Sequence, residues 1–135
     1  MRFAVASICL LLVAACDEGG ATGPSVPFGP RFTLAPGEFT NLAPRTSFRF
    51  VGVTGDSRCP ADAVCILGGD ALVHVEIQQP DGQRLTHELH TGDSRRASAT
   101  YQDKRIELAE LQPYPFSSRT INPQDYRATF AVTGP

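Results

Sequence analysis

Two cysteines, Cys59 and Cys65 in the stretch DSRCPADAVC, are the residues whose type and spacing most directly suggest chemistry. Such a pair can be a redox couple, part of a metal site or a structural disulfide. A redox couple usually has the C-x-x-C spacing at the start of a helix, where the helix dipole lowers a thiol pKa. Here five residues intervene, and Pro60, Ala61 and Ala63 suit a compact loop. A structural disulfide is our leading interpretation, and the chain-entropy model gives this short ring a stabilising contribution of about 2.4 kcal/mol.

A metal site would need further ligands beside the two sulfurs. The histidines of the chain are His74, His87 and His90. If the segments around them are strands, His87 and His90 point to opposite sides of one strand, because successive side chains alternate. We therefore predict no metal site and no cofactor.

Three charged residues surround the cysteines, namely Asp56, Arg58 and Asp62. They could form a recognition surface or a set of ion pairs that holds the loop. Exposed ion pairs contribute about 0–1 kcal/mol, so stability alone is a weak reason for them. Because binding residues are often carried on loops held by a rigid scaffold, we name these three residues as a candidate recognition loop.

The start of the chain has the pattern of an export signal. Met1 and Arg2 precede an apolar run of 13 residues that ends at Ala15, and a transmembrane helix needs roughly 20. The run ends in LVAAC, which resembles a bacterial lipobox. The resemblance implies that residues 1–15 form a cleaved lipoprotein signal peptide and that Cys16 is lipidated.

We therefore expect a lipoprotein of the bacterial cell envelope, anchored by acyl chains on Cys16 and without a transmembrane helix. It would face the periplasm or the cell exterior, and the sequence leaves open which membrane holds it. Such compartments are typically oxidising, which favours a disulfide between Cys59 and Cys65.

The remaining chain divides into a tether and a domain. Residues 16–30 follow the signal with many Gly and Pro residues and no apolar period, which predicts a flexible tether. Residues 31–135 have the length of one ordinary domain. The formal net charge is −2, and no long basic run is present, so we predict no nucleic-acid partner.

The periodicity of the domain is that of strands. In ALVHVEI, alternate residues from Ala71 to Ile77 are apolar, and YRATFAV places Tyr126, Ala128, Phe130 and Val132 on one side. Similar alternation predicts further strands, which in sequence read RFTL, EFTNL, SFRFVGV, RLTHELH and KRIELAEL. The chain is predicted to be all-β.

Turn residues support this reading. Ala35–Glu38 has Pro and Gly in the central positions of a type II turn, and Gln79–Gly82 fits a hairpin loop. About seven or eight short strands predict an immunoglobulin-like antiparallel β-sandwich, with a small β-barrel as the alternative. Tyr126 fits either a tyrosine corner, with its phenol bonded to upstream backbone, or an ordinary core tyrosine.

Two longer stretches carry a family resemblance. GVTGDSRCPADAVCILGGDALVHVEI and LQPYPFSSRTINPQDYRATFAV resemble segments of short bacterial lipoproteins and secreted proteins of unknown function. These share an acidic-Ser-Arg-Cys-Pro stretch, a second Cys and a Gly-x-Ala-x-Val strand, and the resemblance covers most of residues 32–133. The relatives often carry Trp and Ala where this chain has Leu67 and Gly68. The resemblance implies a β-rich envelope domain and supplies no activity.

Motifs of common hydrolases are absent from the sequence: there is no G-x-S-x-G elbow, no H-E-x-x-H and no phosphate-binding glycine loop. We assign no catalytic residue and predict a non-catalytic binding or interaction module. Its partners would be the membrane, through Cys16, and an envelope protein or glycan. The alternatives are a metal-dependent or carboxylate-based hydrolase and a passive structural component of the envelope.

Overall fold

The computed structural model describes residues 30–134. The predicted signal peptide, the lipidation site Cys16 and the tether before Pro30 lie outside the described residues. Within the described part of the chain, no helix has the length and apolar character needed to cross a membrane.

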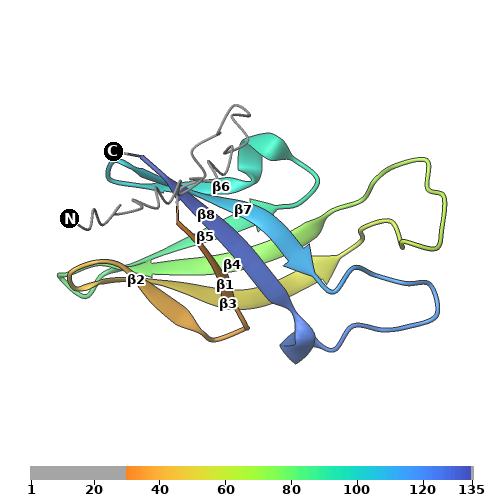
Figure 1. The fold of residues 1–135 in the computed structure, drawn as a ribbon, viewed down its shortest axis with the longest axis horizontal. Coiled ribbons are helices and arrows are strands. Elements are labelled where there is room, and N and C mark those ends of the chain that lie inside the picture. The colour runs from red at the N-terminus through yellow and green to blue at the C-terminus, as the bar shows by residue number, and fades with distance from the viewer. Residues whose placement is uncertain (1–29, 135) are drawn as a thin grey trace, which may run out of the picture.

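Residues 30–134 form two antiparallel sheets of four strands each, which pack as a β-sandwich (Figure 1). One sheet has the order β1-β8-β7-β6, and the other has the order β2-β3-β4-β5. The strands are β1 Arg31–Leu34, β2 Phe39–Ala43, β3 Thr46–Asp56, β4 Ala71–Gln78, β5 Arg84–His90, β6 Ser98–Tyr101, β7 Lys104–Gln112 and β8 Arg127–Thr133. The predicted all-β sandwich is confirmed.

The connectivity is a meander in each sheet. Strands β2 to β5 follow one another in chain order, as do β6 to β8, and β1 pairs with β8. The chain passes between the sheets twice, from β1 to β2 and from β5 to β6. Immunoglobulin domains instead connect their sheets by Greek-key crossings. Because β1 and β6 end one sheet and β2 and β5 end the other, one open edge of the sandwich lies between β1 and β2 and the other lies between β5 and β6.

The core lies between the sheets and is built from alternating side chains. In β4, Ala71, Val73, Val75 and Ile77 are all fully buried, as the sequence pattern predicted. Phe48 and Phe130 face one another from opposite sheets with ring centroids 4.8 Å apart in an edge-to-face arrangement, a geometry that aromatic pairs favour. The full buried cluster comprises Leu34, Phe48, Phe50, Ala71, Val73, Val75, Ile77, Leu89, Ala99, Tyr101, Ile106, Leu108, Leu111, Tyr126, Ala128 and Phe130.

Both predicted turns are present. Glu38 N–H donates to the carbonyl of Ala35 at 3.0 Å, and Gly37 has φ of +87°, as a type II turn requires. Gly82 N–H donates to the carbonyl of Gln79 at 3.0 Å in the β4–β5 hairpin. These short connections lie at one end of the sandwich or along its edge and leave the long loops to the other end.

Tyr126 is a core tyrosine and not a tyrosine corner. Its side chain is buried, and its phenol donates to Oδ2 of Asp56 at 3.0 Å. The corner interpretation is wrong because the acceptor is a carboxylate at the end of β3 and not an upstream backbone carbonyl. Tyr126 thereby joins the C-terminal strand to the beginning of the cysteine loop.

Candidate functional site

Two long loops project from the same end of the sandwich, on the right in Figure 1. The first, residues 57–70, connects β3 to β4 and carries both cysteines; we call it the cysteine loop. The second, residues 113–126, connects β7 to β8 and is called here the second loop. Together they form the loop end, which contains Arg58 and Asp62 and begins directly after Asp56, the last residue of β3.

The base of the cysteine loop extends the hairpin of β3 and β4. Ser57 N–H donates to the carbonyl of Asp70 at 2.7 Å, and Cys59 N–H donates to the carbonyl of Gly68 at 2.9 Å. Gly69 has φ of +69°, and a Cβ at this position would collide with the carbonyl oxygen of Ser57. Glycine is therefore required for the two sides of the loop to close.

A disulfide joins Cys59 and Cys65, with Cα atoms 5.9 Å apart. This confirms the predicted disulfide. Among residues 30–134, no group of three or more His, Cys, Asp or Glu side chains is arranged to hold a metal ion. The disulfide closes the distal part of the loop, beyond the hydrogen bonds at its base.

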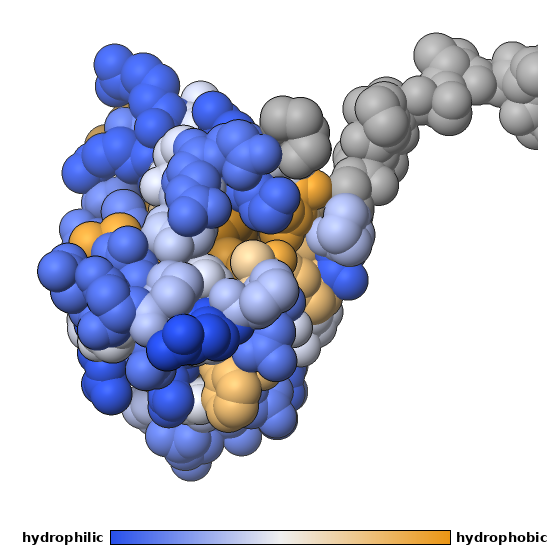
Figure 2. Space-filling view, turned by 90° about the vertical axis from the view of Figure 1, so that its left-hand side faces the viewer, coloured by the Kyte–Doolittle hydropathy of each residue, from blue (hydrophilic) through white to orange (hydrophobic). Residues whose placement is uncertain are grey.

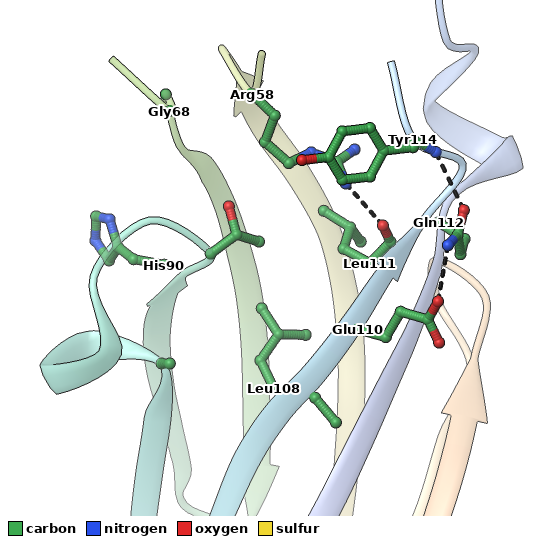
Figure 3. A pocket seen from close by; sticks show the side chains of 12 residues that line it. Arg58, Gly68, His90, Leu108, Glu110, Leu111, Gln112 and Tyr114 are labelled. Carbon is green, nitrogen blue, oxygen red and sulfur yellow. Dashed lines mark hydrogen bonds between the residues drawn. The ribbon is translucent and has the colours of Figure 1, made fainter. Parts of the chain in front are cut away.

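Arg58 fastens the loop to the body of the sandwich. Its guanidinium lies inside the protein and makes a bidentate pair with Asp56, with Nε to Oδ1 at 2.9 Å and Nη2 to Oδ2 at 2.6 Å. It also donates to the backbone carbonyls of Leu111 at 2.7 Å and Pro113 at 2.9 Å. In Figure 3 the guanidinium lies beneath the ring of Tyr114, with 5.0 Å between Cζ and the ring centroid. Arg58 therefore crosslinks the cysteine loop, the end of β7 and the second loop.

The environment of Asp56 keeps its carboxylate charged. Burial acts to raise the pKa of Asp56, but the hydrogen bonds and charge of Arg58, with the phenol of Tyr126, outweigh it and lower that pKa. For Tyr126, burial and then the neighbouring carboxylate raise the pKa to about 12. The phenol is thus held as a neutral donor, and the Asp56–Arg58 pair is a satisfied internal network.

Asp62 connects the two loops near their tips. Its carboxylate accepts a hydrogen bond from Ser117 N–H at 2.9 Å, and this bond lowers the pKa of Asp62. Ala61 N–H donates to the carbonyl of Pro115 at 2.9 Å. The loops therefore support one another in addition to being fastened at their bases.

The tip of the cysteine loop is apolar and open to solvent. Val64 and Ile66, which flank Cys65, are fully exposed, and Leu67 is 81% exposed. On the second loop, Tyr114 and Phe116 are also partly exposed. Fully exposed aliphatic side chains contribute nothing to the core, so the stability of the sandwich does not explain them.

A hollow of about 330 Å³ lies at the base of the cysteine loop. Leu108 and Leu111 line one wall, and Gln112 donates to Glu110 at 2.7 Å beside it (Figure 3). The guanidinium of Arg58 forms another part of the lining, but each of its three nitrogen atoms already donates to a protein group. The cysteine loop therefore supplies no open charged group that could anchor a ligand in the hollow.

The histidines divide between the two faces of the β2–β5 sheet. His74 and His90 lie on the outer face with Glu88 between them, the Nε2 atoms being 3.5 Å and 3.2 Å from its carboxylate. His87 lies opposite Val75 on the inner face, where its Nε2 atom is buried without a hydrogen-bond partner. The predicted opposite orientation of His87 and His90 is therefore confirmed.

A second polar cluster, which the sequence analysis missed, closes the base of the cysteine loop from the other side. Asp70 contacts Nδ1 of His90 at 2.5 Å and accepts from Gly92 N–H at 2.8 Å. Burial acts to raise the pKa of Asp70, but these bonds and that of Thr91 outweigh it and lower the pKa. The usable sequence signal was the position of His90 at the end of a predicted strand. Alternation places His90 on the outer face of the sheet, but it does not show that the side chain is buried there.

The structure places the three charged residues predicted for recognition in two environments. Asp56 and Arg58 point inward and hold the loop, which is the second of the two roles considered for them. Asp62 remains exposed and accepts from the second loop. Val64, Ile66 and Leu67 were not predicted from the sequence to be surface residues, although an apolar run beside a cysteine in a loop was a usable signal.

Comparisons with protein-family models, with curated proteins and with solved structures found no match. What the loop end can bind must therefore be argued from its own geometry.

Proposed function

We propose that the protein is a lipid-anchored module of the bacterial cell envelope that binds a partner protein through the tip of its cysteine loop. It has no catalytic role in this proposal. The observation that carries it is the exposure of Val64, Ile66 and Leu67 on a loop that the disulfide and Arg58 hold in one conformation. A rigid apolar loop loses little conformational entropy on binding, which favours affinity.

The chemistry of the tip favours a protein over a glycan. Glycan sites usually present open aromatic faces to sugar rings, whereas the tip is aliphatic. The nearby rings of Tyr114 and Phe116 each have a guanidinium over them, from Arg58 at 5.0 Å and Arg119 at 4.9 Å. Aliphatic side chains instead fit an apolar pocket on another protein, as buried anchors at protein interfaces do.

The same tip is poorly suited to a membrane surface. Interfacial segments combine apolar residues with Lys or Arg and with Trp or Tyr at the headgroup level. The cysteine loop beyond its buried Arg58 carries one exposed charge near the tip, the carboxylate of Asp62. A carboxylate is repelled by anionic lipid, so we place membrane attachment at Cys16 and not at the loop.

The envelope location is supported by the disulfide and by the lipobox-like sequence that ends at Cys16. Metabolic labelling with a radioactive fatty acid tests the anchor directly. We expect label on the parent chain and none on the Cys16→Ala variant. Label on that variant would contradict the proposed attachment site.

Partner binding is tested by pull-down from solubilised envelopes of cells that naturally produce the chain. We expect a discrete protein to be retained by the parent and lost with Leu67→Asn, and its recovery to fall with Val64→Thr. Val51→Thr is a matched control, because Val51 is 48% exposed on β3 and lies outside the loop end. Equal recovery by Val64→Thr, Leu67→Asn and the parent would contradict binding through the tip.

A further inference from the structure

The open edge between β1 and β2 contains a second cavity, remote from the loop end. It has a volume of about 740 Å³ and is bounded by β1, β2, β8 and the start of β7. We call it the edge cleft. Figure 2 faces the end with the hairpin turns, and hydrophobic residues (orange) gather there in a hollow among hydrophilic ones (blue).

The apolar part of the edge cleft consists of inward-facing side chains that the sandwich does not fully cover. Phe32 lies opposite the buried Phe130, and Val132 lies opposite the buried Ile106, so both point between the sheets. Leu42 is also half-buried and packs against the core from β2. Because β1 and β2 belong to different sheets and do not pair, solvent reaches these residues through the edge.

The described residues that line the edge cleft include two cationic ones, Arg31 and Lys104, and no acidic one. Asp103, the residue beside Lys104, approaches its ammonium group at 3.9 Å from outside the lining. An apolar interior with a cationic border is complementary to a molecule with one hydrocarbon chain and one negative head.

From this geometry we propose that the edge cleft binds a free long-chain fatty acid. The hydrocarbon chain lies on Phe32, Leu42 and Val132 between the sheets, and the carboxylate lies near Lys104. The cavity volume falls in the range of about 300–1,000 Å³ that is usual for small-molecule sites. This site is independent of the loop end and of its proposed partner.

Calorimetric titration of the full chain carrying Cys16→Ser, which removes the proposed attachment point, tests the site with decanoate and dodecanoate below their micellar concentrations. Because each buried methylene contributes about 0.8 kcal/mol, the dissociation constant should fall by up to about fourfold per added methylene. Dodecyltrimethylammonium, which has the same chain and the opposite charge, should bind more weakly than dodecanoate. Affinity that does not depend on chain length or on the sign of the head would overturn the proposal.

Two charge-reversal variants separate the site from general attraction of anions. Lys104→Glu should weaken dodecanoate binding by roughly two- to fivefold, as expected for a partly exposed ion pair. Arg95→Glu is the matched control, because the Arg95 side chain is 89% exposed and lies outside the edge cleft. Equal weakening in both variants would overturn a specific head-group contact at Lys104.

Nuclear magnetic resonance of the same samples locates the ligand. Dodecanoate should shift the side-chain signals of Phe32, Leu42 and Val132 and leave those of Val64 and Ile66 unchanged. Shifts at the loop tip alone would overturn the proposal. Binding of dodecanoate to a Phe28→Ser variant without binding to the parent chain would also overturn the proposal. That result would mean that residues before Pro30 are the occupant of the cleft.

Discussion

The space between the two sheets is closed differently at the two ends of the sandwich. At the loop end, Arg58 and Asp56 fill the opening with a bonded ion pair, and Tyr126 completes it. Along the β1–β2 edge, residues 30–134 form no such network over Phe32 and Leu42, which remain half-buried. The loop end combines a polar interior with an apolar exterior, and the edge cleft has the reverse arrangement.

A small sandwich can therefore form binding surfaces in two ways. A polar network allows a long loop to be rigid, so that apolar residues at its tip can face solvent without collapsing onto the core. An uncovered edge instead exposes the core itself. The first arrangement suits a partner that brings its own pocket, and the second suits a ligand that enters one.

The largest effect is expected from Arg58→Met, which removes the centre of the loop-end network. Asp56 would be left charged and buried without its partner, and breaking such a pair costs about 3–5 kcal/mol. Urea unfolding should show this loss of free energy of unfolding. Arg96→Met, at a 60% exposed side chain, should change it by less than about 1 kcal/mol.

The double variant Asp56→Asn with Arg58→Met sharpens this test. Because it also removes the buried charge, it should be more stable than Arg58→Met alone. If the double variant were the less stable of the two, the residues would not act as a coupled pair.

Gly69→Ala should destabilise the protein by about 2–3 kcal/mol, since it forces a side chain into a left-handed conformation against the Ser57 carbonyl. Gly68→Ala is the control at the adjacent position, where an added Cβ meets nothing within 4 Å. Thermal unfolding of both variants measures the difference. Similar melting of the two would show that the loop base is not closed as described.

Loss of the disulfide should have a somewhat smaller effect. Cys59→Ser should lower the free energy of unfolding by about 2 kcal/mol in the chain-entropy model. Reductant should destabilise the parent to the same extent and leave the variant unchanged. An equal response of parent and variant to reductant would point to an effect unrelated to Cys59 and Cys65.

Tyr126→Phe should have the smallest effect, about 1 kcal/mol, because it removes one hydrogen bond to Asp56. The pKa of Tyr126 is raised from 10.0 to about 12, so the fold favours the protonated phenol. Its contribution is complete below pH 10.0 and is lost as the pH rises through about 12.

Tyrosinate absorbance measures this titration. The difference between the alkaline titrations of the parent and of Tyr126→Phe should have its midpoint near pH 12. A midpoint near the ordinary value of 10.0 would show that the phenol is not held against Asp56.

Strand alternation predicted much of the fold, because burial of one face imposes a period of two on the sequence. The inward positions of β4 followed directly from it, and the type II turn after β1 followed from its central Pro and Gly. The short strand Ser98–Tyr101 was missed, since small and weakly polar residues make up most of it and its alternation does not stand out. The meander order was not predicted either, because alternation determines which face is buried and not which strand lies beside which.

The candidate site was predicted in part. Cysteine spacing and the likeness of the N-terminal sequence to an export signal led to the disulfide, but the burial of Arg58 could not be foreseen. Its partners, the carbonyls of Leu111 and Pro113, lie more than 50 residues away in the chain and are backbone atoms without a sequence signature. Asp70 and His90 were not paired in advance for a different reason: alternation determines which face a residue is on and not which residue of a neighbouring strand lies beside it.

The proposed binding of one partner protein through the apolar tip of the loop end can be tested in cells that naturally produce the chain. A photo-crosslinking amino acid is placed at Ile66 in the full chain, with Val51 as the matched position. We predict one discrete crosslinked protein at Ile66, abolished by Leu67→Asn, and none at Val51. Crosslinks of equal pattern at both positions, or none at Ile66, would contradict it.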